Sequence, residues 1–116
     1  MFFGEYDGIL DKSGKLKIPL QHRELEQGGY VDKFYLMIDH KNSGLLNLYI
    51  PKEFWEENSK QSLQPGEHLG ELSDCCEVKC DENGYITIPQ EFIEGAHLKK
   101  TVSILGALSR IEIRSK

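Results

Sequence analysis

Apolar and polar residues alternate along this chain in short stretches that are separated by turns containing Gly, Asn or Asp. Alternation with a period of two predicts β-strands, and we expect strands over residues 3–10, 15–18, 33–39, 45–50, 76–80, 85–88, 101–106 and 110–115. Pro19, Pro51 and Pro89 each follow such a stretch, and proline fits the first position of a helix. We therefore expect short helices over 20–27, 52–61 and 89–96, with one further turn over 68–74. The pattern predicts a mainly β protein with short helices, in the α+β class.

The chain contains nearly the same segment twice. LDKSGKLKIPLQHR at Leu10–Arg23 matches CDENGYITIPQEFI at Cys80–Ile93. An Asp and a Gly occupy positions where a tight hairpin turn needs an acceptor and a residue tolerant of positive φ. Two alternating apolar residues and a Pro follow them. The matched pairs are Asp11 and Asp81, Gly14 and Gly84, Leu16 and Ile86, Ile18 and Ile88, and Pro19 and Pro89. This spacing predicts an internal duplication of one supersecondary unit.

The length of 116 residues is typical of one domain, and a half of this size would be marginally stable alone. We therefore expect a single domain over 1–116 whose halves bury apolar faces against each other. It comprises a first half at 3–50, a helical linker at 51–74 and a second half at 75–116. No apolar run has the length of a membrane span, and the first residues lack the pattern of a signal peptide. We expect a cytoplasmic protein with no membrane partner.

The net charge of −5 counts against nonspecific binding to nucleic acid. The local charge, however, differs between the two copies of the repeated segment. The first copy is rich in cations and the second in carboxylates: Lys12, Lys15, Lys17 and Arg23 in one, and Asp81, Glu82 and Glu91 in the other. The halves thus share a predicted shape and have opposite local electrostatics.

The three cysteines, Cys75, Cys76 and Cys80, lie close together in the sequence, and adjacent cysteines rarely form a disulfide. No CxxC spacing or His pair supports a zinc site, so we predict no bound metal. Cys76 and Cys80 alternate with Val78 on one strand face, which favours small core residues over a redox or metal role. Cys75 falls off that face, and the sequence leaves its reactivity open.

Little in the sequence supports catalysis. The four histidines are scattered through polar segments without a nucleophile or carboxylate at motif spacing, which favours isolated surface histidines. Gly-rich phosphate motifs do not occur. Phe54 and Trp55 are most simply core residues of the linker helix, with a subunit interface as the alternative for Trp55. We expect no enzymatic activity, no catalytic residue, no cofactor and no small-molecule substrate.

Four segments together resemble the MraZ family of bacterial transcriptional regulators. In order they are GEYDGILDKSGKLKIPLQHR, LLNLYIPKEFWEE, CEVKCDENGYITIPQEFI and VSILGALSRIEI, and they cover almost the whole chain. The resemblance implies two half-domains of the AbrB/SpoVT type, whose swapped hairpins interlock into one pseudo-twofold β-barrel. It also implies a homo-oligomeric ring that binds short repeated sites in double-stranded DNA upstream of division and cell-wall genes. Such a protein would associate with the nucleoid.

The family signature at each hairpin is Asp-x-x-x-Arg, with the Arg directed toward DNA. Asp11 and Asp81 match the Asp, but Lys15 and Tyr85 stand where the family has Arg. Lysine keeps the charge and lacks the guanidinium fork that can read guanine bidentately. The linker segment QSLQPGEHLGELSD is also shorter and more acidic than is usual in the family.

Two hypotheses remain open from the sequence. In the first, the chain is a DNA-binding regulator that uses the first copy, with Lys12, Lys15 and Lys17 on phosphates or bases and Arg23 on phosphate or a carboxylate. The alternative for these residues is that they form an ordinary solvated strand face without a binding role. In the second hypothesis, the chain is an AbrB-like interaction or scaffold module with weakened or lost DNA binding, in keeping with its acidic balance.

Overall fold

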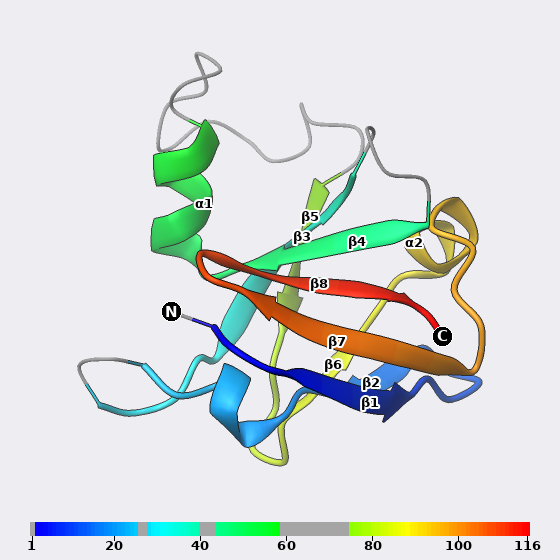
Figure 1. Ribbon diagram of the computed structural model, residues 1–116, viewed down its shortest axis with the longest axis horizontal. Helices are drawn as coiled ribbons and strands as arrows, with labels where there is room; N and C mark the ends of the chain where they lie inside the picture. Colours follow the sequence, from blue (N-terminus) through cyan, green and yellow to red (C-terminus); the bar gives the residue numbers. More distant parts are fainter. Residues whose placement is uncertain (1, 26–27, 40–43, 59–74) are drawn as a thin grey trace.

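The computed structural model describes residues 2–25, 28–39, 44–58 and 75–116, and for residues 55–58 the backbone only (Figure 1). Eight strands and three short helical segments follow one another. The strands are β1 Glu5–Ile9, β2 Lys15–Lys17, β3 Lys33–Ile38, β4 Leu45–Tyr49, β5 Cys75–Lys79, β6 Tyr85–Thr87, β7 Thr101–Ala107 and β8 Arg110–Ser115. The helices are the 3-10 turn η1 Leu20–His22, α1 Pro51–Asn58 and α2 Gln90–Gly95. The predicted mainly β class with short helices is confirmed.

Six antiparallel strands form one sheet in the order β1-β7-β8-β4-β3-β5, and β2 and β6 pair separately. The first strand of each half hydrogen-bonds to the other half, because β1 pairs with β7 and β5 pairs with β3. The order is therefore symmetric about the contact between β4 and β8, which joins the two halves in the centre of the sheet. The described strands do not close into a barrel, since β1 and β5 are edges of the six-stranded sheet.

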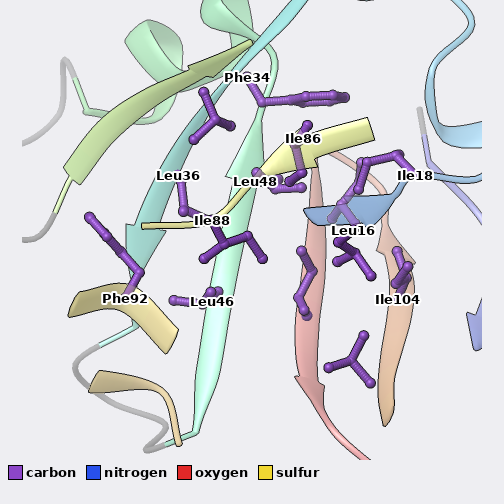
Figure 2. Packing of buried hydrophobic residues seen from close by; sticks show 14 of the residues in the cluster. Leu16, Ile18, Phe34, Leu36, Leu46, Leu48, Ile86, Ile88, Phe92 and Ile104 are labelled. Atoms are coloured by element: carbon purple, nitrogen blue, oxygen red, sulfur yellow. The ribbon is translucent and has the colours of Figure 1, made fainter. Parts of the chain in front are cut away.

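The hydrophobic core lies between this sheet and the β2–β6 pair (Figure 2). Alternate residues of β2 and β6 and of the residues that follow them point inward, namely Leu16, Ile18, Ile86 and Ile88. In Figure 2 they meet side chains of the sheet, including Phe34, Leu36, Leu46, Leu48 and Ile104. Each of these side chains is essentially inaccessible to water, and full burial of one such side chain contributes about 1.5–3 kcal/mol.

Residues 23–25 of the helix predicted over 20–27 are not helical, and residues 26 and 27 lie outside the described residues. Only η1 forms, and the chain then reverses so that Glu24 and Tyr30 make an antiparallel bridge. The reversal depends on Gly28 and Gly29, which adopt φ values of +95° and +84°, a region that favours glycine. The amide of Gly28 bonds the carbonyl of Leu25, so the glycines make a tight turn rather than end a helix. In the second half, α2 forms as expected.

A second, smaller cluster fixes α1 on the sheet. Phe54 is fully buried, with its ring centroid 4.8 Å from that of Tyr35 and 5.8 Å from that of Tyr49, both edge-on. The predicted core role of Phe54 is confirmed, while the side chain of Trp55 and the turn predicted over 68–74 lie outside the described residues. No helix in the described ranges is long and apolar enough to cross a membrane.

All three cysteines are free thiols. Cys80 is buried in the main core and Cys76 is half-buried, as expected for small packing residues. Cys75 is also buried, because the opposite face of β5 packs on the cluster around Phe54. Burial raises the pKa of the Cys75 thiol to about 12 and that of Cys76 to about 11. Cys75 therefore lacks both the exposure and the thiolate that a reactive cysteine needs.

Candidate nucleic-acid interface

The two hairpin tips of the repeated segments lie side by side as a two-stranded antiparallel ribbon. In its register Lys15 is opposite Thr87, and Lys17 is opposite Tyr85. Two further bonds of 2.8 Å extend the pairing, from the amide of Ile18 to Gly84 O and from the amide of Ile88 to Gly14 O. Because side chains alternate across a strand, the outer side presents Lys15, Lys17, Tyr85 and Thr87, all of them exposed. We call these four residues the ribbon face.

The two turns that begin the ribbon strands share one geometry. Asp11 Oδ1 accepts hydrogen bonds of 2.9 Å from the amides of Ser13 and Lys15. Asp81 Oδ1 accepts equivalent bonds of 2.9 Å from the amides of Asn83 and Tyr85. These bonds lower the pKa of both carboxyl groups. The largest effect comes from the amide of the first strand residue, Lys15 or Tyr85. Each Asp is therefore a fixed anion that orients residue 15 or residue 85.

A glycine completes each turn at the one position where backbone geometry demands it. Gly14 and Gly84 both have φ of +88°. A Cβ on Gly14 would lie 2.5 Å from the carbonyl oxygen of Ile88, so any side chain would push the ribbon strands apart. The Asp and Gly of each repeat are thus explained by the turn alone, and they leave the exposed positions free to differ.

The predicted lysines of the first copy lie on or beside the ribbon face. Lys15 and Lys17 stand on the same side of β2, and Lys12 is exposed in the first turn. The Nζ atom of Lys17 lies 5.9 Å from the ring centroid of Tyr85, within the range of a cation–π contact. Within the described residues, none of these three ammonium groups makes an ion pair with a carboxylate.

Arg23 is placed differently from the lysines. It is half-buried below the second turn, and its Nε donates a 2.8 Å hydrogen bond to the carbonyl oxygen of Ile18. Its guanidinium packs so closely on Gly84 that a Cβ there would lie 2.4 Å from Cζ. In the other half, Ile93 occupies the matching place, 3.5 Å from the Cβ position of Gly14. The structure thus shows Arg23 supporting the second turn from below.

Two lysines that the sequence did not single out lie next to the first turn. Lys99 and Lys100 precede β7 and share a shallow pocket with Lys12 and Asp11. A 2.8 Å bond from the amide of Leu10 to the carbonyl of Lys100 joins the two segments. The sequence shows Lys99 and Lys100 as a pair, but no local pattern indicates that they lie beside the turn that begins at Asp11.

The second turn has the opposite electrostatic surroundings. The pocket beside it is lined by Asp32, Asp81 and Glu82, with Arg23 as the one cation there among the described residues. The amide of Cys80 bonds the carbonyl of Asp32 at 2.8 Å, in the same way that Leu10 bonds Lys100. The first turn is consequently basic, whereas the second turn has carboxylates in this pocket and Lys33 and Lys79 in a neighbouring pocket that Tyr85 also lines.

The prediction that the histidines lie on the surface is confirmed for His97, which is exposed, and is wrong for His22, which is buried. His40 and His68 lie outside the described residues. His22 is fully buried below the N-terminal segment, edge-on to Phe2 at 5.9 Å and to Tyr6 at 5.1 Å between centroids. Neither ring nitrogen has a hydrogen-bond partner of ordinary geometry. Burial lowers the pKa of the imidazole, so the native protein holds it neutral.

The fold and the ribbon face together define a class: a small, mainly β protein in which two similar halves pair their hairpin tips and present a charged, exposed ribbon. Comparison with known proteins names the family. A family model described as "MraZ protein, putative antitoxin-like" matches residues 72–116. The chain is 35% identical to the transcriptional regulator MraZ of Caldicellulosiruptor saccharolyticus, with all of this chain and 82% of the relative covered.

Other relatives give the same result. Identity is 36% to the transcriptional regulator MraZ of Dictyoglomus thermophilum, over all of this chain and 80% of that protein. It is 34% to that of Clostridium acetobutylicum, over all of this chain and 82% of the relative. The chain belongs to the MraZ family, and the family resemblance inferred from the sequence is confirmed.

Proposed function

We propose that this protein is a DNA-binding transcriptional regulator that contacts double-stranded DNA through the ribbon face. The observation that carries the proposal is the pair Lys15 and Lys17, exposed on one strand and without an ion pair among the described residues. In a chain with net charge −5, two exposed lysines on one strand face are a specific feature rather than a general one. The names of the relatives support a regulator.

The geometry of the ribbon fits one side of the duplex. The major groove of B-DNA is about 12 Å wide and admits a two-stranded β-ribbon. The buried residues Leu16 and Ile86 anchor the inner side of the ribbon, so the outer side is a rigid platform. Lys15 and Lys17 would replace condensed counterions on the phosphates or donate to base edges, and Lys12 would contact a phosphate beside the turn.

The residues of the second half limit the strength of such a contact. Tyr85 adds no cation, and Asp81 and Glu82 would repel phosphates. We include Arg23 in the proposed DNA-binding set with a phosphate or carboxylate as its partner, although its Nε already bonds Ile18. Ring assembly would compensate, because several weak contacts on one molecule bind with avidity.

The finer features of the family are part of the same proposal. Two interlocked swapped-hairpin halves are supported by the pairing of β1 with β7 and of β5 with β3. Ring assembly is supported by exposed apolar side chains where the N-terminal segment meets the β7–β8 turn, namely Phe3, Leu105 and Leu108. The proposed targets are short repeated sites upstream of division and cell-wall genes, read in the cytoplasm by a protein without enzymatic activity. Light scattering that shows a clean monomer would contradict the ring.

The acidic second turn favours one alternative function. Asp32, Asp81 and Glu82 gather in one pocket, and this surface suits a protein partner better than DNA. In that case the chain is an interaction or scaffold module that kept the fold and lost most of its affinity for DNA.

Fluorescence anisotropy with a labelled duplex from the chain's own upstream region separates the two functions. Titrations at several salt concentrations should show affinity that falls steeply with salt, and Lys15→Glu should abolish binding. Lys52→Glu is the control with the same change of charge, because Lys52 is an exposed lysine on α1, on the other side of the molecule from β2 (Figure 1). A folded protein that does not bind this duplex at low salt would refute the proposal.

A further inference from the structure

We propose that Lys99 and Lys100 form, with Lys12, a second phosphate-binding site beside the first turn of the ribbon. The inference rests on the proposed DNA-binding function and extends it to residues of the second half. The ligand is a backbone phosphate of the DNA strand that borders the ribbon face. The site would make the first turn the joint product of both halves of the chain.

The three lysines come from two segments that are far apart in sequence. Lys12 lies in the turn between β1 and β2, and Lys99 and Lys100 lie in the connection from α2 to β7. All three are exposed and line the same shallow pocket. Figure 1 shows the blue turn after β1 beside the orange connection that leads into β7, in agreement with the bond from Leu10 to Lys100. The pocket lies at the end of the ribbon that carries Lys15.

The cations of this site are not neutralised by the protein. Some other basic side chains of the described surface have carboxylate partners, for example Lys33 with Glu77 at 3.8 Å and Arg110 with Glu112 at 3.0 Å. No ion pair involves Lys12, Lys99 or Lys100 within the described ranges. The one carboxylate in the pocket, Asp11, directs an oxygen to the amides of its own turn. An excess of positive charge therefore remains for an anion.

The backbone that carries the two lysines is held in place by the end of β8. The amide of Lys99 donates a 2.6 Å hydrogen bond to Ser115 Oγ, which in turn donates to the carbonyl of His97 at 3.0 Å. The amide of Lys116 bonds the carbonyl of Thr101 at 3.0 Å. A connection fixed in this way costs less conformational entropy on binding than a free loop does.

In the other half, carboxylates occupy the positions that match two of these lysines. Glu82 takes the place of Lys12 in the repeat, and Asp32 takes the place of Lys100 in the hydrogen bonding. A phosphate would therefore be attracted beside Lys12 and Lys100 and repelled beside Glu82 and Asp32. The structure thus predicts a one-sided phosphate contact.

The test measures the salt dependence of DNA binding by the double variant Lys99→Gln/Lys100→Gln. Each phosphate contact that is lost lowers the slope of log affinity against log salt by about one, so the double variant should lose about two. The variant Lys99→Arg/Lys100→Arg should keep the wild-type slope. Because both positions are exposed, each variant should retain the wild-type melting temperature.

Lys52→Gln/Arg114→Gln is the control with the same loss of charge. Arg114 is exposed next to the buried Ile113 on β8, so it points away from the side of the sheet that the ribbon covers. The control should keep the wild-type slope. An unchanged slope in Lys99→Gln/Lys100→Gln, in a protein whose binding Lys15→Glu still abolishes, would overturn this inference alone. A wild-type protein that does not bind DNA would overturn the proposed function and this inference with it.

Discussion

Removal of the side chain of Leu16 should test whether the ribbon joins the two halves of the protein. Leu16 and Ile86 face each other across the β2–β6 pair, and both are fully buried. Truncation of a fully buried Leu or Ile to Ala typically costs about 3–5 kcal/mol when the cavity cannot collapse. A domain of this size has a total stability of about 5–15 kcal/mol. The single substitution Leu16→Ala should therefore remove at least about a fifth of the stability.

Urea unfolding followed by circular dichroism measures this loss. The variants Leu16→Ala, Ile86→Ala and the double variant form a thermodynamic cycle, and neighbouring core residues should show a coupling energy of about 0.5 kcal/mol or more. Thr87→Ala on the exposed side of β6 is the control and should change stability by at most about 0.5 kcal/mol. A loss below about 1 kcal/mol for Leu16→Ala would refute the argument that the ribbon is packed on the core.

Further predictions concern the turns, the buried imidazole, the thiols and the reading position. Gly84→Ala should destabilise the protein by about 1–3 kcal/mol in urea unfolding, because φ is +88° and the new Cβ meets the Arg23 guanidinium; an unchanged midpoint would contradict this. Since the pKa of His22 is lowered in the native protein, stability should be full above pH 6.5 and fall as the pH drops through the native pKa. Urea midpoints from pH 7.5 to 4.5 would show it, and His22→Phe should flatten that part of the profile. Cys75 should react with a thiol reagent only after unfolding, as alkylation followed by mass spectrometry would show; rapid labelling of the native protein would be inconsistent with its burial. Tyr85→Arg should tighten DNA binding in anisotropy titrations, because it adds a cation with a guanidinium fork to the ribbon face, and a loss of affinity would argue against that face.

The local structure of the repeated segments could be predicted from the sequence because it depends on neighbouring residues. Asp11 and Gly14 specify a turn through bonds within four residues, and Leu16 alternates with exposed lysines on a short strand. The helix expected over 20–27 could not be corrected from the sequence, because Gly28 and Gly29 suit the end of a helix as well as a tight turn. In the structure both glycines serve a reversal that lets Tyr30 pair with Glu24.

The contacts between the halves could not be read from single positions. The alternation of Cys75 with Cys76 places Cys75 on the strand face that is not expected to be in the core. It is nevertheless buried, because it packs in one cluster with Phe54 of α1. His22 follows a polar residue and is buried beneath the N-terminal segment. Lys100 meets the first turn only because β1 pairs with β7 of the other half. Each of these outcomes depends on pairing across a long stretch of chain.

Lysine acetylation of the protein with and without the upstream duplex, read by mass spectrometry, tests the central claim most directly. If the ribbon face binds DNA at its first turn, the duplex should protect Lys12, Lys15 and Lys17 and leave Lys52 as reactive as before. Equal reactivity of Lys15 with and without bound duplex, or protection of Lys52 in its place, would show that DNA meets another surface of the protein.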